Sequence, residues 1–155
     1  MMSTAAKACP YHRICGAATV WMLASGACTR RPSEHPLIIT GTDYAFQTPD
    51  TVPAGQAVIR FVNQGKVPHE LALARLKAGV TLDQVLERMR EGAEPDELLD
   101  GMAGVLFATP GDSSFGRLVV ELSRGRTYGM ICNFRDAPDQ PPHVALGMVA
   151  SFQVK

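Results

Sequence analysis

TYGMICNFRDAPDQPPHVALGMVASFQV, residues 127–154, contains two runs rich in β-branched and aromatic side chains on either side of a loop with three prolines. The runs Thr127–Phe134 and Met148–Val154 are typical of β-strands. The prolines reduce the disorder that folding must remove from the loop. This part of the chain therefore predicts two strands joined by a loop whose length folding can tolerate.

The rest of the chain repeats the pattern of short strands. Four further runs are typical of strands: Leu37–Thr42, Ala57–Val62, Leu71–Leu76 and Arg117–Leu122. Thr48-Pro49-Asp50 and Pro53-Ala54-Gly55 are typical of turns. Because the strands follow one another without the alternation of strand and helix that parallel sheets need, the pattern predicts an all-β, antiparallel Greek-key β-sandwich.

One segment, at about residues 80–100, changes from strand to helix periodicity. Thr81 and Gln84 have the spacing of a capping box, and an apolar face follows until Gly92. Pro95 predicts a second short helix through Leu99. Leucine and methionine at helical spacing are typical of core packing, so we interpret this insertion as a lid on the sandwich.

Composition limits the class of protein. The 155 residues are 46% hydrophobic and 19% charged, and 15 basic residues balance 15 acidic ones. This length suits one domain that buries about two-thirds of its unfolded surface. The charge balance fits neither a disordered chain nor a nucleic-acid-binding protein. The 14 glycines and 11 prolines favour short elements joined by many turns.

The first 27 residues resemble a secretory signal. Basic residues precede the uncharged stretch Ile14–Cys28, and small residues before Cys28 allow cleavage after Ala27. We therefore predict a signal peptide over 1–27, a polar tether over 28–36 and a domain over 37–155. The exported protein is expected in the periplasm or cell envelope.

Cys28 lies where a bacterial lipoprotein signal has its acylated cysteine, which predicts possible membrane anchoring, although Ser25 replaces the usual aliphatic residue. A plain secreted protein and an uncleaved anchor are the alternatives.

Removal of Cys9 and Cys15 with the signal leaves Cys132 as the one thiol inside the predicted domain. A disulfide framework is excluded. Such a thiol is either buried and inert or kept for metal or nucleophilic chemistry.

Metal chemistry is favoured by the neighbours of this thiol in the sequence. Ten residues separate Cys132 from His143, and four separate His143 from Met148, while His69 precedes a predicted strand far upstream. Two imidazoles, a thiolate and a weak thioether are the ligands that copper uses for one-electron transfer. Zinc gains little from a thioether.

The segment Asn63-Gln64-Gly65-Lys66-Val67-Pro68-His69 and the order Cys132, His143, Met148 resemble the cupredoxin family of blue copper proteins, such as plastocyanin. The resemblance covers roughly residues 37–155. It implies one type 1 copper held by His69, Cys132, His143 and Met148. It also implies a Greek-key sandwich that exchanges single electrons with a redox partner protein, without a substrate, a nucleic acid or an enzymatic activity.

The chain departs from the family at two places. Its loop from cysteine to histidine is longer than usual, which adds only about 0.6 kcal/mol of closure free energy per doubling of length. Glu70 stands where plastocyanin has asparagine. Asp136 and Asp139, in the longer loop, are interpreted as solvated charges.

Two other functions remain open. The same ligands suit copper storage or delivery, and a sandwich without metal would suit an interaction module. A hydrolase is disfavoured because no nucleophile elbow or oxyanion motif surrounds Cys132.

Overall fold

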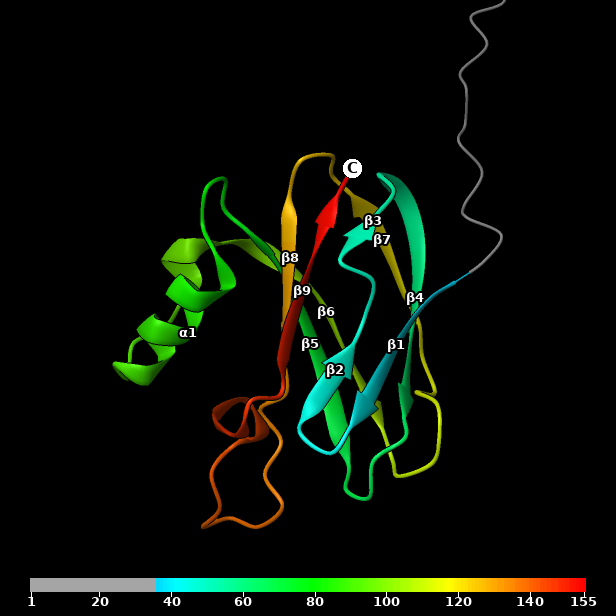
Figure 1. Cartoon of the computed structure of the whole chain (residues 1–155), viewed down its shortest axis with the longest axis vertical. Coiled ribbons are helices and arrows are strands. Elements are labelled where there is room, and N and C mark those ends of the chain that lie inside the picture. The colour runs from blue at the N-terminus through cyan, green and yellow to red at the C-terminus, as the bar shows by residue number, and fades with distance from the viewer. Residues whose placement is uncertain (1–35) are drawn as a thin grey trace, which may run out of the picture.

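The computed structural model describes residues 36–155. They form two facing β-sheets with one α-helix beside them (Figure 1). The strands are β1 Leu37–Thr42, β2 Ala45–Gln47, β3 Thr51–Val52, β4 Gly55–Asn63, β5 His69–Leu76, β6 Leu99–Ala108, β7 Leu118–Leu122, β8 Thr127–Ile131 and β9 Val149–Val154. The helices are α1 Leu82–Arg90 and the 3-10 turns η1 Asp96–Leu98 and η2 His143–Leu146. The predicted sandwich with a short helical insertion is confirmed.

The sheets are mixed, whereas the sequence predicted antiparallel pairing throughout. Their strand orders are β2-β1-β4-β7 and β3-β9-β8-β5-β6, with β1 parallel to β4 and β3 parallel to β9. The physical reason is the path of the chain between β1 and β4. After β2 the chain crosses to the other sheet to form β3 and then returns, so that β4 enters the first sheet in the direction of β1.

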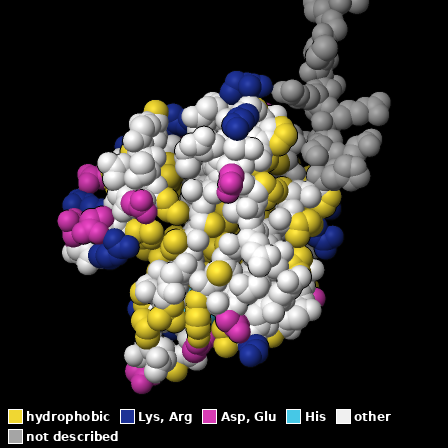
Figure 2. Space-filling model, viewed as in Figure 1, with side chains coloured by type: hydrophobic (Ala, Val, Ile, Leu, Met, Phe, Trp, Pro, Cys, Tyr) yellow, Lys and Arg dark blue, Asp and Glu magenta, His cyan; other side chains and the backbone are white. Residues whose placement is uncertain are grey.

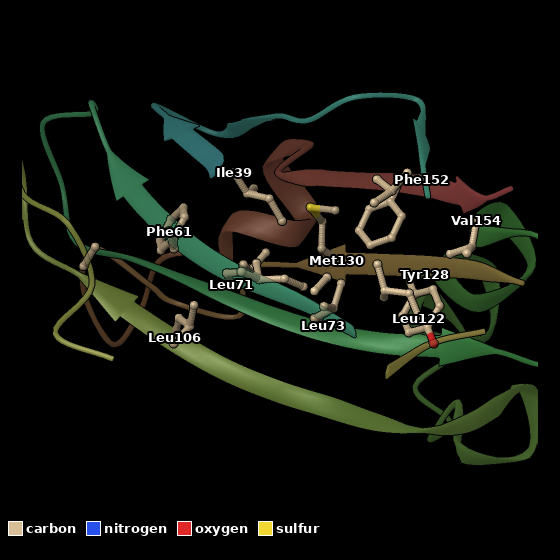
Figure 3. Packing of buried hydrophobic residues seen from close by; sticks show 14 residues of the cluster. Ile39, Phe61, Leu71, Leu73, Leu106, Leu122, Tyr128, Met130, Phe152 and Val154 are labelled. Atoms are coloured by element: carbon tan, nitrogen blue, oxygen red, sulfur yellow. The ribbon is translucent and has the colours of Figure 1, made fainter. Parts of the chain in front are cut away.

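The core lies between the sheets, where side chains of both layers point toward one another (Figure 3). Along β4 the buried side chains alternate, with Ala57, Ile59 and Phe61 turned inward. A buried side chain of the size of Ile59 or Phe61 stabilises the fold by about 1.5–3 kcal/mol. Tyr128 stacks on Phe152 with ring centroids 5.5 Å apart. This core gives the residues at the ends of the strands a rigid support.

Helix α1 begins as the sequence predicts. The Thr81 hydroxyl accepts the Gln84 N–H at 3.3 Å, and the Gln84 side chain accepts the Thr81 N–H at 2.9 Å. Val85 and Leu86 are buried, and a Cβ at Gly129 of β8 would lie 3.1 Å from Leu82. The helix therefore covers the outer face of the five-stranded sheet, as expected of a lid, and leaves a cavity of about 370 Å³ beneath it.

Three strands were not predicted. Strands β2 and β3 are only three and two residues long. Strand β6 has ten residues, but it lies at a sheet edge, only two of its residues are buried, and Gly101 and Gly104 have φ of 123° and 146°. Such a strand has neither clear alternation nor β-branched enrichment. The predicted second helix after Pro95 is the single 3-10 turn η1.

The predicted signal peptide, the predicted acylation site at Cys28 and almost all of the predicted polar tether lie outside the described residues. Within residues 36–155, no helix is long and apolar enough to cross a membrane. The predicted domain starts at Leu37, which is also the first residue of β1.

Candidate metal centre

Three metal-ligating side chains meet at one end of the sandwich, and all three are fully buried. The Nδ1 atoms of His69 and His143 are 3.1 Å apart, and the Cys132 Sγ lies 4.0 Å and 3.4 Å from them, respectively. In Figure 1 the β1–β2 turn, the β4–β5 loop and the loop between β8 and β9 gather at this lower end. Segments far apart in sequence thus build one site.

The sheet register explains how His69 and Cys132 meet. Strand β5 opens with His69, and its antiparallel neighbour β8 ends one residue before Cys132, with Ala72 opposite Ile131. The start of one strand and the end of the other therefore lie at the same edge of the sheet. Because side chains alternate along a strand, His69 lies on the same face as the core residue Leu71, and Cys132 continues the face of the core residue Met130.

The following loop returns His143 to the cysteine. The His143 N–H donates to the Phe134 carbonyl at 2.9 Å, and the Val144 N–H donates to the Cys132 carbonyl at 2.7 Å. Gly147 ends η2 in the left-handed region, with φ of 100°, and so turns the chain toward β9. The ten-residue separation is therefore closed by backbone hydrogen bonds.

Met148, the fourth predicted ligand, is also fully buried. Its N–H donates to the His143 carbonyl at 2.9 Å, and its carbonyl accepts the Cys132 N–H at 3.2 Å. A Cβ on Gly41 would lie 3.2 Å from the Met148 methyl carbon and 2.8 Å from Phe61. The backbone of Met148 is thus hydrogen-bonded to the backbones of both His143 and Cys132, and its side chain is enclosed.

The loop before His69 is held by two polar side chains. Asn63 is fully buried; its amide donates to the Val67 and Ala108 carbonyls at 2.8 and 3.0 Å and accepts the Gly65 N–H at 2.8 Å. Asp43 accepts the Lys66 N–H at 2.7 Å. These bonds fix the direction in which the chain enters β5.

The sulfur of Cys132 accepts a hydrogen bond from the Glu70 N–H at 3.3 Å. The Glu70 carboxylate accepts the Asn133 N–H at 2.8 Å. Glu70, which departs from the family pattern, therefore ties β5 to the residue after the cysteine through its backbone and its side chain.

The sequence analysis missed two residues of the site. Asp136, interpreted there as a solvated charge, lies with Oδ1 3.0 Å from the outer nitrogen of His143, Nε2. Its other oxygen accepts the Tyr44 hydroxyl at 2.6 Å. Because Tyr44 and Asp136 are 92 positions apart and Tyr44 lies beside the unpredicted strand β2, no local pattern signals this contact.

Burial and hydrogen bonding change how these groups hold protons. Burial raises the pKa of the Cys132 thiol. Burial, with the neighbouring His143 second, lowers the pKa of His69. The hydrogen bond from Tyr44 lowers the pKa of Asp136, and the same bond raises the pKa of Tyr44. The metal-free site therefore favours a neutral His69 and a protonated thiol, and metal binding must displace that proton.

The spacing of the three donors suits a single metal ion. Two nitrogens about 2.0–2.1 Å from one tetrahedral ion lie about 3.3 Å apart, and a sulfur about 2.3 Å from it lies about 3.6 Å from each nitrogen. The observed separations of 3.1, 3.4 and 4.0 Å are close to these values. Two imidazoles and a thiolate, with the methionine nearby, fit one type 1 copper ion.

No protein-family model and no curated protein matches the sequence. Among solved structures, auracyanin B is 21% identical and aligns with 79% of this chain and 92% of its own, with a TM-score of 0.52. Auracyanin A, a "blue" copper protein from Chloroflexus aurantiacus, is 18% identical over 81% and 100% of the two chains, with a TM-score of 0.47. Reduced rusticyanin is 18% identical over 80% and 83%, with a TM-score of 0.47. The likeness to auracyanin B shows that the chain has the cupredoxin fold.

Proposed function

We propose that this cupredoxin-fold protein binds one copper ion through His69, Cys132, His143 and Met148 and carries single electrons between redox partner proteins. The observation that carries the proposal is the buried meeting of two imidazole Nδ1 atoms and one sulfur within 4.0 Å of one another. Soft sulfur suits Cu(I) and imidazole keeps Cu(II) accessible, so the bound metal would supply one-electron chemistry.

The protein's own residues would keep the two oxidation states similar in structure. Cys132 and His143 are joined by backbone bonds around their loop, and His69 is fixed by the loop that Asn63 organises. A rigid, water-excluding site needs little rearrangement when an electron arrives or leaves. The full burial of the three donors favours a carrier over an enzyme, because metal catalysis needs a position open to substrate.

We further propose that the protein is exported by a signal over residues 1–27, with a tether over 28–36 and the copper domain over 37–155. The basic start, the uncharged centre and the small residues before Cys28 support cleavage after Ala27. Acylation of Cys28 would then anchor the domain to a membrane of the cell envelope. Mass spectrometry of the mature amino terminus tests both points: an unprocessed Met1 or an unmodified Cys28 would overturn the cleavage or the anchor, respectively.

The copper proposal is tested by adding Cu(II) to the purified protein and recording its visible spectrum. An intense thiolate-to-copper band is expected, and Cys132→Ser should abolish it. Cys28→Ser is the matched control, because it removes a thiol outside the described domain and should leave the band intact. A colourless wild-type protein, or a band that survives Cys132→Ser, would overturn the assignment.

Redox cycling separates the carrier from the other readings. A carrier should lose and regain its colour under a mild reductant and oxidant while retaining its copper. Transfer of the metal to an acceptor protein or chelator would instead identify a storage or delivery protein. If the protein takes up no copper, the remaining interpretation is a metal-free interaction module.

A further inference from the structure

One of the two buried histidines has a carboxylate on its outer nitrogen. Asp136 Oδ1 lies 3.0 Å from His143 Nε2, and Asp136 Oδ2 accepts the Tyr44 hydroxyl at 2.6 Å. The three residues come from the β1–β2 turn, the loop after β8 and the start of η2. They form a chain of contacts from a half-buried tyrosine to a fully buried imidazole.

This chain of contacts determines which nitrogen of His143 carries the proton. An ionised carboxylate only accepts hydrogen bonds, so a bonded Nε2 must be protonated in neutral imidazole. The lone pair is then on Nδ1, which faces the Cys132 sulfur at 3.4 Å. The other oxygen of Asp136 accepts the Tyr44 hydroxyl, so the carboxylate cannot rotate away from His143 without losing its hydrogen bond to Tyr44. The imidazole is therefore oriented before any metal arrives.

We propose that Asp136, held in place by Tyr44, is a positioning residue that fixes His143 as the Nε2–H tautomer and favours Cu(II) over Cu(I) at this site. The part that concerns copper rests on the proposed function; the tautomer does not. A negative charge that is hydrogen-bonded to Nε2 makes the imidazole a stronger electron-pair donor to the metal through Nδ1. Cu(II) carries more charge than Cu(I), so it is stabilised more by this effect.

The backbone of Tyr44 supports a specific role for this contact. Tyr44 has φ of 62°, and no other non-glycine residue with positive φ occurs in residues 36–155. Such a conformation is strained for a residue with a side chain and persists only where the surroundings impose it. In this conformation the tyrosine ring stands edge-on to the His143 ring, with centroids 5.0 Å apart, and 6.5 Å from the His69 ring.

His69 provides an internal contrast. Its Nε2 is 4.0 Å from Asp43 Oδ1 and has no hydrogen-bond partner among the described residues. Asp43 instead accepts the backbone N–H of Lys66. Of the two imidazoles, His143 is therefore the one that a carboxylate orients through a hydrogen bond.

The tautomer is measured on the metal-free protein by NMR with 15N-labelled histidine at mildly alkaline pH. Wild-type His143 is expected as a single Nε2–H tautomer, and Asp136→Ala should show a mixture of both. Asp139→Asn is the matched control, since Asp139 is an exposed carboxylate in the same loop. A wild-type Nδ1–H tautomer, or an Asp136→Ala spectrum identical to wild type, would overturn the positioning role even if the copper site is confirmed.

The charge effect is measured on the copper-loaded protein with Asp136→Asn, which keeps an oxygen acceptor but removes the charge. Its reduction potential should be more positive than that of wild type, by clearly more than the change in Asp139→Asn, and Cu(II) affinity should fall about 10-fold to 100-fold. Equal shifts in the two variants would contradict the proposal. A wild-type protein with no copper band would refute the proposed function instead, while the tautomer measurement would still decide the role of Asp136.

Discussion

Gly65 lies against the outer side of the His69 ring. A Cβ at this position would be 2.6 Å from Asp43 Oδ1, 2.9 Å from His69 Nε2 and 3.2 Å from Asn63 Oδ1. These separations are shorter than van der Waals contact, and all three neighbours are fixed by packing or hydrogen bonds. A side chain at residue 65 therefore has no space unless the imidazole moves.

We expect Gly65→Ala to displace His69 and to weaken Cu(II) binding about tenfold, with a loss of about 1–3 kcal/mol in the free energy of unfolding. Gly116→Ala is the control, because its Cβ would meet Leu106 at an ordinary 3.7 Å. Copper titration and urea unfolding of both variants are the measurements. Unchanged copper affinity in Gly65→Ala would show that His69 is not held in this position.

Two of the four shifted pKa values at the site, those of the buried His69 and Cys132, predict how pH affects the stability of the metal-free protein. The pKa of His69 lies below 6.5 in the folded state, so below about pH 6.5 the unfolded chain binds more protons than the folded one. The free energy of unfolding therefore decreases as the pH is lowered. The pKa of Cys132 lies above 9.0, so above about pH 9.0 the unfolded chain loses its thiol proton first and stability falls as pH rises.

Urea unfolding, repeated at acidic, neutral and alkaline pH, is expected to give the highest free energy of unfolding between about pH 6.5 and about pH 9.0. His69→Gln should flatten the acidic side of the profile, and Cys132→Ser should flatten the alkaline side. If both variants retain the wild-type profile, other groups control the pH dependence.

Helix α1 is stabilised by its cap and by contact with the sheet. Figure 2 shows hydrophobic side chains gathered between α1 and the loop that carries His143, where a small cavity of about 190 Å³ is lined by Leu86, Met89 and Val144 among others. The helix lies against β8 and this loop, and none of its residues belongs to the buried group His69, Cys132 and His143. Its local stability should therefore be separable from metal binding.

We expect Thr81→Ala to lower the free energy of unfolding by about 1 kcal/mol, because the Gln84 N–H loses its acceptor. Thr81→Ser keeps the hydroxyl and should lose little. Thermal unfolding measures the difference, and the copper spectrum of both variants should match wild type. A spectral change in Thr81→Ala alone would indicate that the cap of α1 controls the site.

Elements with a strong local signal were predictable from the sequence. The bounds of β1 agree with the predicted Leu37–Thr42, and the capping box at Thr81 and Gln84 is present. Strand β6 was not predictable, because its glycines and exposed side chains give it little strand propensity of its own. It is a strand because its backbone pairs with β5. The parallel pairing of β1 with β4 depends on where the chain crosses between sheets, which strand periodicity does not encode.

The candidate site shows the same division. His69, Cys132, His143 and Met148 were predicted as ligands from their spacing and from the family resemblance, and the structure buries all four. Asp136 and Tyr44 were missed because their roles arise from a contact between the β1–β2 turn and a distant loop. A carboxylate in a proline-rich loop has the same sequence pattern whether or not an imidazole faces it.

Across the whole molecule, a metal would connect segments that are distant in sequence. His69 is 63 residues from Cys132 and 74 residues from His143. Copper that binds these groups only in the folded state stabilises it by about 4.1 kcal/mol at a thousandfold excess over Kd. The melting temperature of wild type should rise with copper, and that of Cys132→Ser should rise much less. Equal increases would place the metal elsewhere.

The most direct test is a crystal structure of the copper-loaded protein with anomalous diffraction at the copper absorption edge. Our account predicts a single copper peak bonded to the Nδ1 atoms of His69 and His143 and to the Cys132 sulfur. A peak away from these atoms, or either imidazole turned out of bonding distance of the metal, would contradict it.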